Sequence, residues 1–279
     1  MGLIIPQVYS QMLREKMLGK LRLGGRCVQL DLPQFRQVGE TVIFPKFKLI
    51  GEVEDLPQGK DFEMKPEKLQ QSSSSATVMH KGKTVRVNDY DDLTAMGNFI
   101  EEAKEQQSLR FAQCLDKELY KEALKSKLKV STAEATKITP EELSEGFAKF
   151  GDDVDAESFD AIYIHSLVQD SFMKMPLFID LTKSTAIYGN GIMVRGCIGS
   201  FRGIPVIVSD TMMDNNECTT LIVKKNALAY MLKRDLFVEE ERESKAKATD
   251  IVADMLFAVK QIDDLGVVVL RKTTTNKTA

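Results

Sequence analysis

The sequence has no tryptophan, two histidines and four cysteines in 279 residues. The cysteines lie far apart along the chain, at Cys27, Cys114, Cys197 and Cys218. They form no C-x-x-C pair, so they indicate neither a zinc site nor a disulfide framework, and a reducing cytoplasm fits them. His80 and His165 are too few for a histidine-rich metal site or an evident catalytic triad. Ordinary packing or surface exposure explains both histidines.

Long apolar runs are also missing. No stretch approaches the roughly 20 apolar residues that a membrane-spanning helix needs. Polar and charged residues interrupt the segment from Met1 to Gly25, which excludes the apolar core of a signal peptide. The formal net charge is only -3. The chain therefore has no global basic field, and tight charge-driven binding to nucleic acid is excluded as its main activity.

Two short segments resemble ligand sites without matching one. No Lys-Ser or Lys-Thr follows Gly189-Asn190-Gly191, and the glycine spacing is not G-x-G-x-x-G, so a hairpin turn explains it. The acidic segment from Asp152 to Glu157 lacks the spacing and the turn glycine of a calcium loop. An enzyme that binds nucleotide or metal through these segments is a distant alternative. We predict no catalytic, cofactor-binding or metal-binding residue and no enzymatic activity.

What the sequence does contain is a long polar hairpin. Glu40 to Leu49 alternates as a strand does, with Pro45 placing it at an edge or a bulge. Ala76 to Val87 is the predicted return strand. The connection between them, Gly51 to Ser75, has few large apolar residues and cannot form a core of its own. A connection of this length indicates a projecting arm that a binding partner orders.

A long predicted helix, from Asp91 to about Lys127, follows the hairpin and would be roughly 50 Å long. Its apolar residues recur at helical spacing, at Leu93, Met96, Ile100, Ala103, Phe111, Leu115, Leu119 and Ala123. One buried stripe on so long a rod is typical of a spine that supports the rest of a lobe. The alternative is a kinked pair of helices broken near Gln106 to Ser108, where the apolar content is weak.

The N-terminal segment is basic and helical in pattern. Pro6 to Leu21 is a predicted amphipathic helix whose apolar residues are Val8, Met12, Leu13, Met17 and Leu21. It can dock on its own subunit or on another. Residues 1–30 carry five basic residues and one acidic residue, whereas residues 239–243 carry four glutamates and one arginine. Solvated faces explain both runs. The sharper hypothesis is that the basic arm meets the acidic strand of a neighbouring subunit.

The rest of the chain alternates short helices and strands. Helices are predicted after Thr139 and from Ser166 to Lys174. The predicted strands are 159–164, 192–201, 204–209, 221–223 and 267–270. Asn226 to Leu232 is predicted as a helical turn or a strand near the centre of the second lobe. Ile251 to Ile262 is ambiguous, because its periodicity matches a helix while its apolar content also suits a buried strand.

The order of these elements resembles that of tailed-bacteriophage major capsid proteins with the Hong Kong 97 type fold. The segments that carry the resemblance are VRVNDYDDL from Val85, GSFRGIPVIVS from Gly199, VEEERE from Val238, TDIVAD from Thr249 and GVVVLR from Gly266. Their order spans nearly the whole chain. The resemblance implies that Ile251 to Ile262 is a strand, and we adopt that assignment over the helical periodicity.

The resemblance implies an α+β Hong Kong 97 type phage capsid fold with an N-terminal arm, an extended β-hairpin loop, a long spine helix, and peripheral and axial domains. The implied divisions are 1–38 for the arm, 39–88 for the extended loop, 89–134 for the spine helix and peripheral domain, 135–235 for the axial domain, and 236–279 for the closing strands of the peripheral domain and the tail. One or two lobes both suit a chain of this length.

The implied function is that of a major capsid (head) protein that self-assembles into pentamers and hexamers. These would form the icosahedral shell of a virion around a double-stranded DNA genome, assembled in the host bacterial cytoplasm without a membrane. Beyond copies of itself, the expected partners are a separate scaffolding protein, a portal and decoration proteins, with the packaged DNA contacted weakly and without sequence specificity. An encapsulin-like compartment enclosing enzyme cargo is the alternative.

The predicted subunit interface combines the basic arm, the loop and the acidic strand. Its residues are Arg14, Lys16, Lys20, Arg22, Lys60, Phe62, Lys65, Lys68, Glu239, Glu240, Glu241 and Glu243. Some members of the family cross-link subunits through a loop lysine. We do not predict cross-linking here, because nothing in the sequence indicates the partner residue or the catalytic carboxylate.

Overall fold

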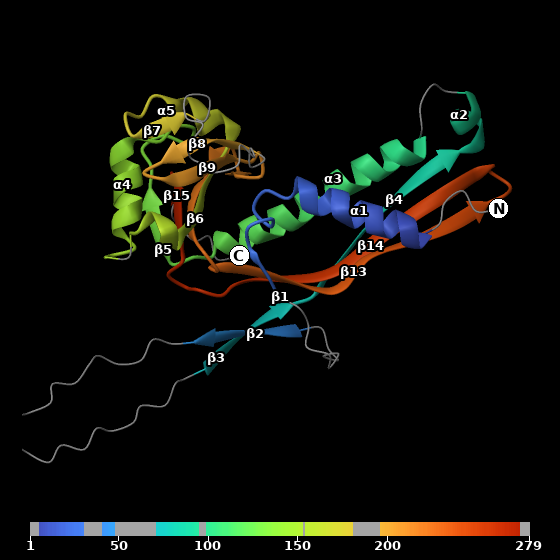
Figure 1. Cartoon of the computed structure of the whole chain (residues 1–279), viewed down its shortest axis with the longest axis horizontal. Coiled ribbons are helices and arrows are strands. Elements are labelled where there is room, and N and C mark those ends of the chain that lie inside the picture. Colours follow the sequence, from blue (N-terminus) through green and yellow to red (C-terminus); the bar gives the residue numbers. More distant parts are fainter. Residues whose placement is uncertain are drawn as a thin grey trace, which may run out of the picture.

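A computed structural model describes residues 6–30, 41–47, 71–94, 99–152, 154–180 and 196–273. These residues form two lobes and a small arm (Figure 1). The first lobe is built on a long helix and a four-stranded sheet, the second on a seven-stranded sheet, and the arm on a two-stranded hairpin. No helix in these ranges is long and apolar enough to cross a bilayer.

Two helices lie side by side in the first lobe (Figure 1). Helix α1 (Pro6–Lys20) packs along helix α3 (Phe99–Ala123) of the same chain. This confirms the predicted N-terminal helix and places it on its own subunit. The predicted apolar face is only partly right, since Val8 and Met12 are 53% and 40% exposed. The buried stripe is instead spaced every four residues, at Tyr9, Leu13, Met17 and Leu21.

Helix α3 covers one face of a four-stranded sheet in the order β1-β13-β14-β4. The strands are β1 (Val28–Leu30), β4 (Met79–Asn88), β13 (Leu228–Glu243) and β14 (Ala248–Gln261). Strands β13 and β14 form a long antiparallel hairpin, and β1 pairs in parallel with the first residues of β13. Alternate residues of β14 from Ile251 to Phe257 are buried. This period of two is that of a strand and confirms the strand assignment over the helical one.

The second lobe is a mixed sheet in the order β5-β15-β12-β6-β9-β8-β7. Its strands are β5 (Leu128–Ser131), β6 (Phe159–Ile164), β7 (Phe178–Asp180), β8 (Cys197–Phe201), β9 (Ile204–Val208), β12 (Thr220–Lys224) and β15 (Val267–Arg271). One face belongs to the apolar core that also holds α1, α3 and the long hairpin. The other face packs against helices of its own lobe in a second core. The two lobes therefore share one continuous core.

Short elements complete the second lobe. They are α4 (Pro140–Ala148), η1 (Ala156–Ser158), η2 (Ser166–Val168), α5 (Gln169–Met173), β10 (Met213–Asp214) and β11 (Glu217–Cys218). Thr139 and Glu142 form the capping box at the start of α4, each side chain accepting from the other's backbone N–H. Strands β8 and β9 are joined by a turn in which Arg202 and Gly203 both have positive φ, as the sequence between the two predicted strands suggests.

The arm is the base of the predicted hairpin. Strands β2 (Thr41–Phe47) and β3 (Gln71–Thr77) pair antiparallel, with Pro45 opposite Ser73 in this two-stranded sheet. The single return strand predicted from Ala76 to Val87 is wrong in detail. The chain leaves the arm at Val78 and continues as β4, which pairs with β14 instead. The predicted connection from Gly51 to Ser75 is also too long, because residues 71–75 belong to β3. Its other residues, 51–70, lie outside the described ranges.

The predicted spine is present but shorter. Residues Asp89–Thr94 form a separate short helix, α2, with a different axis from α3 in Figure 1, and α3 begins at Phe99. Its 25 residues correspond to about 37 Å. It ends at Ala123 because the chain turns into β5, and the Ser126 hydroxyl in that turn donates to the Val267 carbonyl.

The alternative break near Gln106 to Ser108 is wrong, because α3 is continuous there. The polar residues serve the packing of the helix on its neighbours. The buried Gln107 amide donates to the carbonyls of Lys83 and Ile251, and its side-chain oxygen accepts from the Tyr9 hydroxyl. Buried polar groups with full hydrogen bonding substitute here for the missing apolar residues.

Strand β15 and the segment from Asn226 to Leu232 lie in different sheets. Strand β15, expected among the closing strands of the peripheral domain, lies inside the seven-stranded sheet between β5 and β12. Its residues Val267 to Leu270 are buried on both faces, as an interior strand requires. For Asn226 to Leu232, predicted as a helical turn or a strand near the centre of the second lobe, the strand is right but belongs to the four-stranded sheet of the first lobe. After Asn226, with positive φ, the chain enters the long strand β13.

Candidate assembly surfaces

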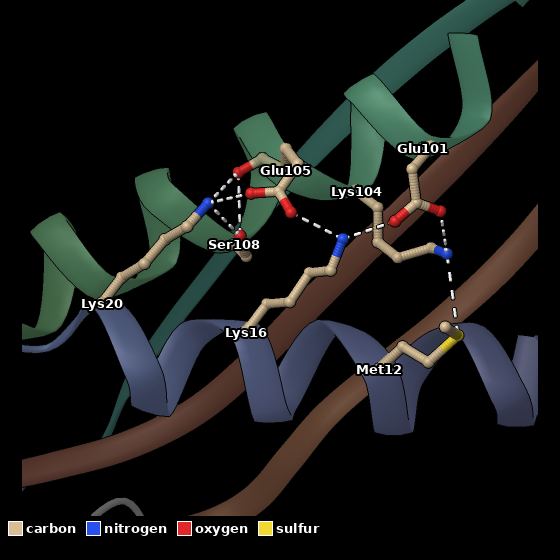
Figure 2. Close-up of polar contacts among 7 residues, drawn as sticks. All are labelled: Met12, Lys16, Lys20, Glu101, Lys104, Glu105 and Ser108. Carbon is tan, nitrogen blue, oxygen red and sulfur yellow. Dashed lines mark hydrogen bonds and ion pairs between the residues drawn. The ribbon is translucent and has the colours of Figure 1, made fainter. Parts of the chain in front are cut away.

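The basic residues predicted to contact a neighbour face the spine helix of their own chain. Figure 2 shows Lys16 and Lys20 reaching from α1 toward α3. Lys16 pairs with Glu101 and lies 2.6 Å from a Glu105 oxygen. Lys20 lies 2.5 Å from the other Glu105 oxygen and donates to the Ser108 hydroxyl at 2.9 Å. The two lysines and two glutamates thus clamp the helices together along their polar edge.

The electrostatics of this clamp follow from its geometry. Hydrogen bonds from Lys16 and Lys20 lower the pKa of Glu105 from 4.5 to about 2. Lys104 and Lys16 lower the pKa of Glu101 in the same way. Lys104 is itself buried, with its ammonium 2.8 Å from Glu101 and over the ring of Tyr9. Below the clamp, the apolar stripe of α1 excludes water, so the helix is held by both polar and apolar contacts.

The other two basic residues of the predicted interface also have partners within the chain. Arg14 forms an ion pair with Asp235 of β13 at 2.8 Å, on an exposed surface. Arg22 donates to the backbone carbonyl of Val208 in the second lobe. The hypothesis that this arm meets the acidic strand of another subunit therefore stays a prediction.

The acidic run lies on the outer half of β13. Strand β1 pairs only with Ala229 to Met231, so among the described residues no strand continues along that edge of β13. Glu239, Glu241 and Glu243 are largely exposed, and Glu243 pairs with Arg86 of β4 at 2.9 Å. Charged side chains of this kind prevent an open strand edge from pairing indiscriminately.

A groove of about 500 Å³ runs between this edge and the start of α1. Pro6, Gln7 and Ser10 form one side of it, and β13 from Phe237 to Glu241 forms the other. Phe237 is 45% exposed. The groove thus combines an exposed aromatic ring with a row of carboxylates, a surface that suits a basic or backbone-rich partner.

The arm meets the body of the subunit through a third, small core. Val42 and Phe44 of β2 are buried against Ala229, Met231 and Ala258 of the long hairpin. Ile43, between them, points outward and is 52% exposed. The predicted interface residues of the loop, Lys60, Phe62, Lys65 and Lys68, lie outside the described ranges.

The sequence did not reveal two carboxylates, Asp116, which is buried, and Asp160, which is partly buried. Asp116 on α3 accepts from the backbone N–H groups of Arg22 and Gly24, at 3.0 and 2.8 Å. Asp160 on β6 accepts from Arg26 and from the Tyr163 hydroxyl. Burial raises the pKa of both carboxyl groups. A signal existed for Asp116, because it lies between Leu115 and Leu119 on the buried stripe of the helix.

The residues weighed for catalysis or metal binding do not come together. Within the described ranges, no cluster of three or more histidine, cysteine or acidic side chains has the arrangement of a metal site. His80 lies on the exposed face of β4 and pairs with Asp254. His165 is buried, and its Nδ1 accepts from the Leu167 N–H at the start of η2. Gly189 to Gly191 lie outside the described ranges.

Comparison with known proteins places this geometry in context. No protein-family model matches the chain. The major capsid protein of Staphylococcus phage phiMR11 is 26% identical over 269 residues, which cover 96% of this chain and 93% of that protein. The mature capsid of bacteriophage PhiM1 matches with a TM-score of 0.60 at 10% identity, over 90% of this chain and 86% of that one. The capsid of a native GTA particle matches with a TM-score of 0.64 at 10% identity, over 91% and 90%.

Each of these matches covers nearly the whole of both chains compared. At 10% identity, the structural matches establish the fold. The chain has the phage capsid fold, and the predicted α+β class and the predicted resemblance are confirmed.

Proposed function

We propose that this chain is the major capsid protein of a tailed bacteriophage and forms the shell of its head. The observation that carries the proposal is the end-to-end sequence likeness to a phage major capsid protein, on a chain that has the capsid fold. The relative is a phage protein, which favours a phage head over a compartment for enzyme cargo. The role is structural, and the chain needs no catalytic residue to perform it.

Self-assembly follows from the shape of the subunit. A hairpin arm whose base is anchored in its own core can present residues 48–70 to an adjacent copy. Such a contact is heterologous, so repetition by rotation closes subunits into rings, here pentamers and hexamers, and rings join into an icosahedral shell. Each contact can be weak, because a closed lattice multiplies contacts through effective concentration.

The charge distribution supports a container for DNA. A net charge of -3 gives no strong attraction to phosphate. The clamp on α1 also neutralises Lys16 and Lys20 with carboxylates of the same subunit. Packaged double-stranded DNA would then be touched weakly and without sequence specificity. A scaffolding protein, a portal and decoration proteins remain candidate partners in the virion, which would be assembled in the host bacterial cytoplasm.

The intersubunit contacts belong to the proposal as well. Lys16 and Lys20 are engaged within the subunit, whereas Glu239 and Glu241 on the acidic edge are exposed and can face another copy, with Glu240 between them. Lys60, Lys65 and Lys68, on the segment that the arm presents, carry the complementary charge. Phe62 supplies an apolar contact in the same segment.

The test removes residues 48–70 from the hairpin arm and keeps the paired strands β2 and β3 at its base. Phe47 pairs with Gln71, so replacing residues 48–70 by Asn-Gly makes a two-residue hairpin turn at that point. We expect this variant to fold with the wild-type circular dichroism spectrum and melting curve but to form no shells by negative-stain electron microscopy.

A control replaces the same segment by a Gly/Ser linker of equal length and is also expected to fail in assembly. Closed particles of normal size from both variants would contradict the role assigned to the segment.

A further inference from the structure

The seven residues between α1 and β1, Leu21 to Cys27, form an elbow where the parts of the subunit meet. In Figure 1 the chain turns here beside the end of α3 on its way to β1. Leu21 and Leu23 are buried in the core shared by both lobes, and Cys27 is partly buried against it. The elbow therefore contacts the spine helix, the long hairpin and the seven-stranded sheet within a few residues.

The spine side of the elbow is held by Asp116 of α3. Its carboxylate accepts from the N–H groups of Arg22 and Gly24. A side chain at position 24 would lie 3.3 Å from Leu119 and 3.4 Å from the Asp116 carboxylate. The glycine thus allows the backbone to approach the helix closely.

The other side of the elbow is held by two arginines that bind the second lobe. Arg22 donates to the Val208 carbonyl at the end of β9. Arg26 donates through one nitrogen to the Asp160 carbonyl at 2.8 Å and to its carboxylate at 3.1 Å. Strands β9 and β6 are neighbours in the seven-stranded sheet, and Val208 lies opposite Ile164 of β6. The two arginines therefore bind two separate points of one sheet.

These contacts differ in kind from the apolar core around them. Apolar packing between the lobes is favourable but non-directional, so it tolerates a small rotation of one lobe on the other. Hydrogen bonds weaken steeply when their angles change, and a planar guanidinium holds the direction of each of its N–H groups fixed. Two arginines on a backbone that is itself fixed to α3 resist such a rotation.

We propose that Arg22 and Arg26 fix the angle between the two lobes and thereby set the curvature of the assembled shell. The subunit part of this inference is independent of assembly, and only its effect on the shell rests on the proposed function. In a lattice of heterologous contacts, a rotation within each subunit changes the angle between neighbours. The shell then closes at another radius, or particles of several radii form.

The arginines are positioning residues, and the double variant R22A/R26A should still fold. Asp160 keeps the hydrogen bond from the Tyr163 hydroxyl, and the elbow backbone keeps Asp116. A matched control is R14A, which removes an arginine of the same arm whose ion pair with Asp235 joins α1 and β13 within the first lobe. A second variant, R26K, keeps the charge but replaces the planar guanidinium, whose one nitrogen donates to both Asp160 oxygens, by a freely rotating ammonium on a shorter side chain.

The first measurement uses free subunits. Probes at Glu141 on α4 and Lys245 at the tip of the long hairpin, both exposed, report the distance between the lobes by pulsed electron paramagnetic resonance. We expect a single narrow distance distribution in wild type and R14A, and a shifted or broader one in R22A/R26A, with R26K between them. Identical distributions in all four folded proteins would overturn the inference. If R22A/R26A does not fold, R26K is compared with R14A. A shifted or broader distance distribution in R26K then supports the inference, and identical distributions overturn it.

The second measurement is the diameter of particles by cryo-electron microscopy. We expect one diameter for wild type and R14A, and particles of mixed diameter or open sheets for R22A/R26A. Wild-type diameter in R22A/R26A, with its melting temperature lowered, would mean that the arginines only stabilise the subunit and would overturn the proposal. If wild-type subunits form no particles at all, the proposed function fails, while the distance measurement on free subunits still tests the angle.

Discussion

Replacement of Asp116 by alanine tests how the N-terminal arm is attached to the spine. Asp116 is buried, with 4% of its surface exposed, and accepts from the N–H groups of Arg22 and Gly24. In D116A both donors would lose their acceptor at a site that water reaches poorly. The N-terminal arm would keep its other contacts, among them the clamp at Lys16 and Lys20 and the apolar stripe of α1.

The magnitude follows from the number of donors left without a partner. A buried polar group without its hydrogen bond costs about 1–3 kcal/mol, so two cost about 2–6 kcal/mol. Alanine returns about 0.5 kcal/mol through its higher helix propensity. Burial disfavours the ionised form of Asp116, so removal of this carboxylate offsets a further part of the lost free energy. We therefore expect D116A to lower the free energy of unfolding by about 1–4 kcal/mol. D116N, which keeps one oxygen acceptor, should lower it by about half as much.

The assay is urea denaturation of unassembled subunits, combined with hydrogen exchange of the Arg22 and Gly24 amides. The control is K117A, a neighbouring exposed position on the same helix. We expect loss of protection at both amides in D116A and none in K117A. The reasoning would be refuted if D116A and K117A had unfolding free energies within about 0.5 kcal/mol of each other, the usual range for surface substitutions.

Three further predictions concern the contacts of the N-terminal helix α1, of the spine helix α3 and of the hairpin arm. M17A removes a fully buried side chain and should cost about 2–5 kcal/mol of unfolding free energy, whereas M12A, at a position 40% exposed, should cost much less; equal denaturation midpoints would contradict this packing. The pKa of Glu105 is about 2 in the folded chain and 4.5 without its partners. The stabilisation that ionised Glu105 gives to the docking of α1 is therefore complete above pH 4.5 and is lost as the pH falls toward 2. Hydrogen exchange of α1 should show this loss in wild type and not in E105Q. F44A should release the base of the arm, seen as lost amide protection in β2 and β3, and I43A, on the exposed side, should not; retained protection in F44A would show that the arm is held elsewhere.

Local signals in the sequence predicted the elements whose causes are local. The start of α4 was predictable because Thr139, Pro140 and Glu142 form a capping box within four residues. The turn at Arg202 and Gly203 was likewise marked between two apolar runs. The strand at Ile251 to Ile262 was not decided by its periodicity, and the family resemblance was needed to assign it.

Contacts between distant residues were not predictable in the same way. Asp116 and Gly24 are 92 residues apart, and Arg26 and Asp160 are 134 apart, so neither pair leaves a pattern in a short window. Gln107 and Ser108 misled the reasoning for a related cause. Polar residues in the middle of a helix suggested a break, while the structure buries them against partners that the sequence does not reveal.

The charged arm shows the limit of the interface prediction. The basic surplus of residues 1–30 was a correct observation, and the hypothesis attached to it looked for partners on another subunit. Lys16, Lys20 and Arg22 have partners on the spine and the second lobe of the same chain, and the intersubunit hypothesis stays a prediction. Charge pattern indicates that a partner exists, but it does not tell whether that partner lies in the same subunit.

The central claim is that copies of this chain close into a shell. Its most direct test is cryo-electron microscopy, with light scattering of the same sample, on the chain expressed alone over a wide range of concentration. The account predicts rings of five and six subunits or closed shells, each subunit reaching a neighbour through residues 48–70. A single monomeric species at every concentration would contradict it.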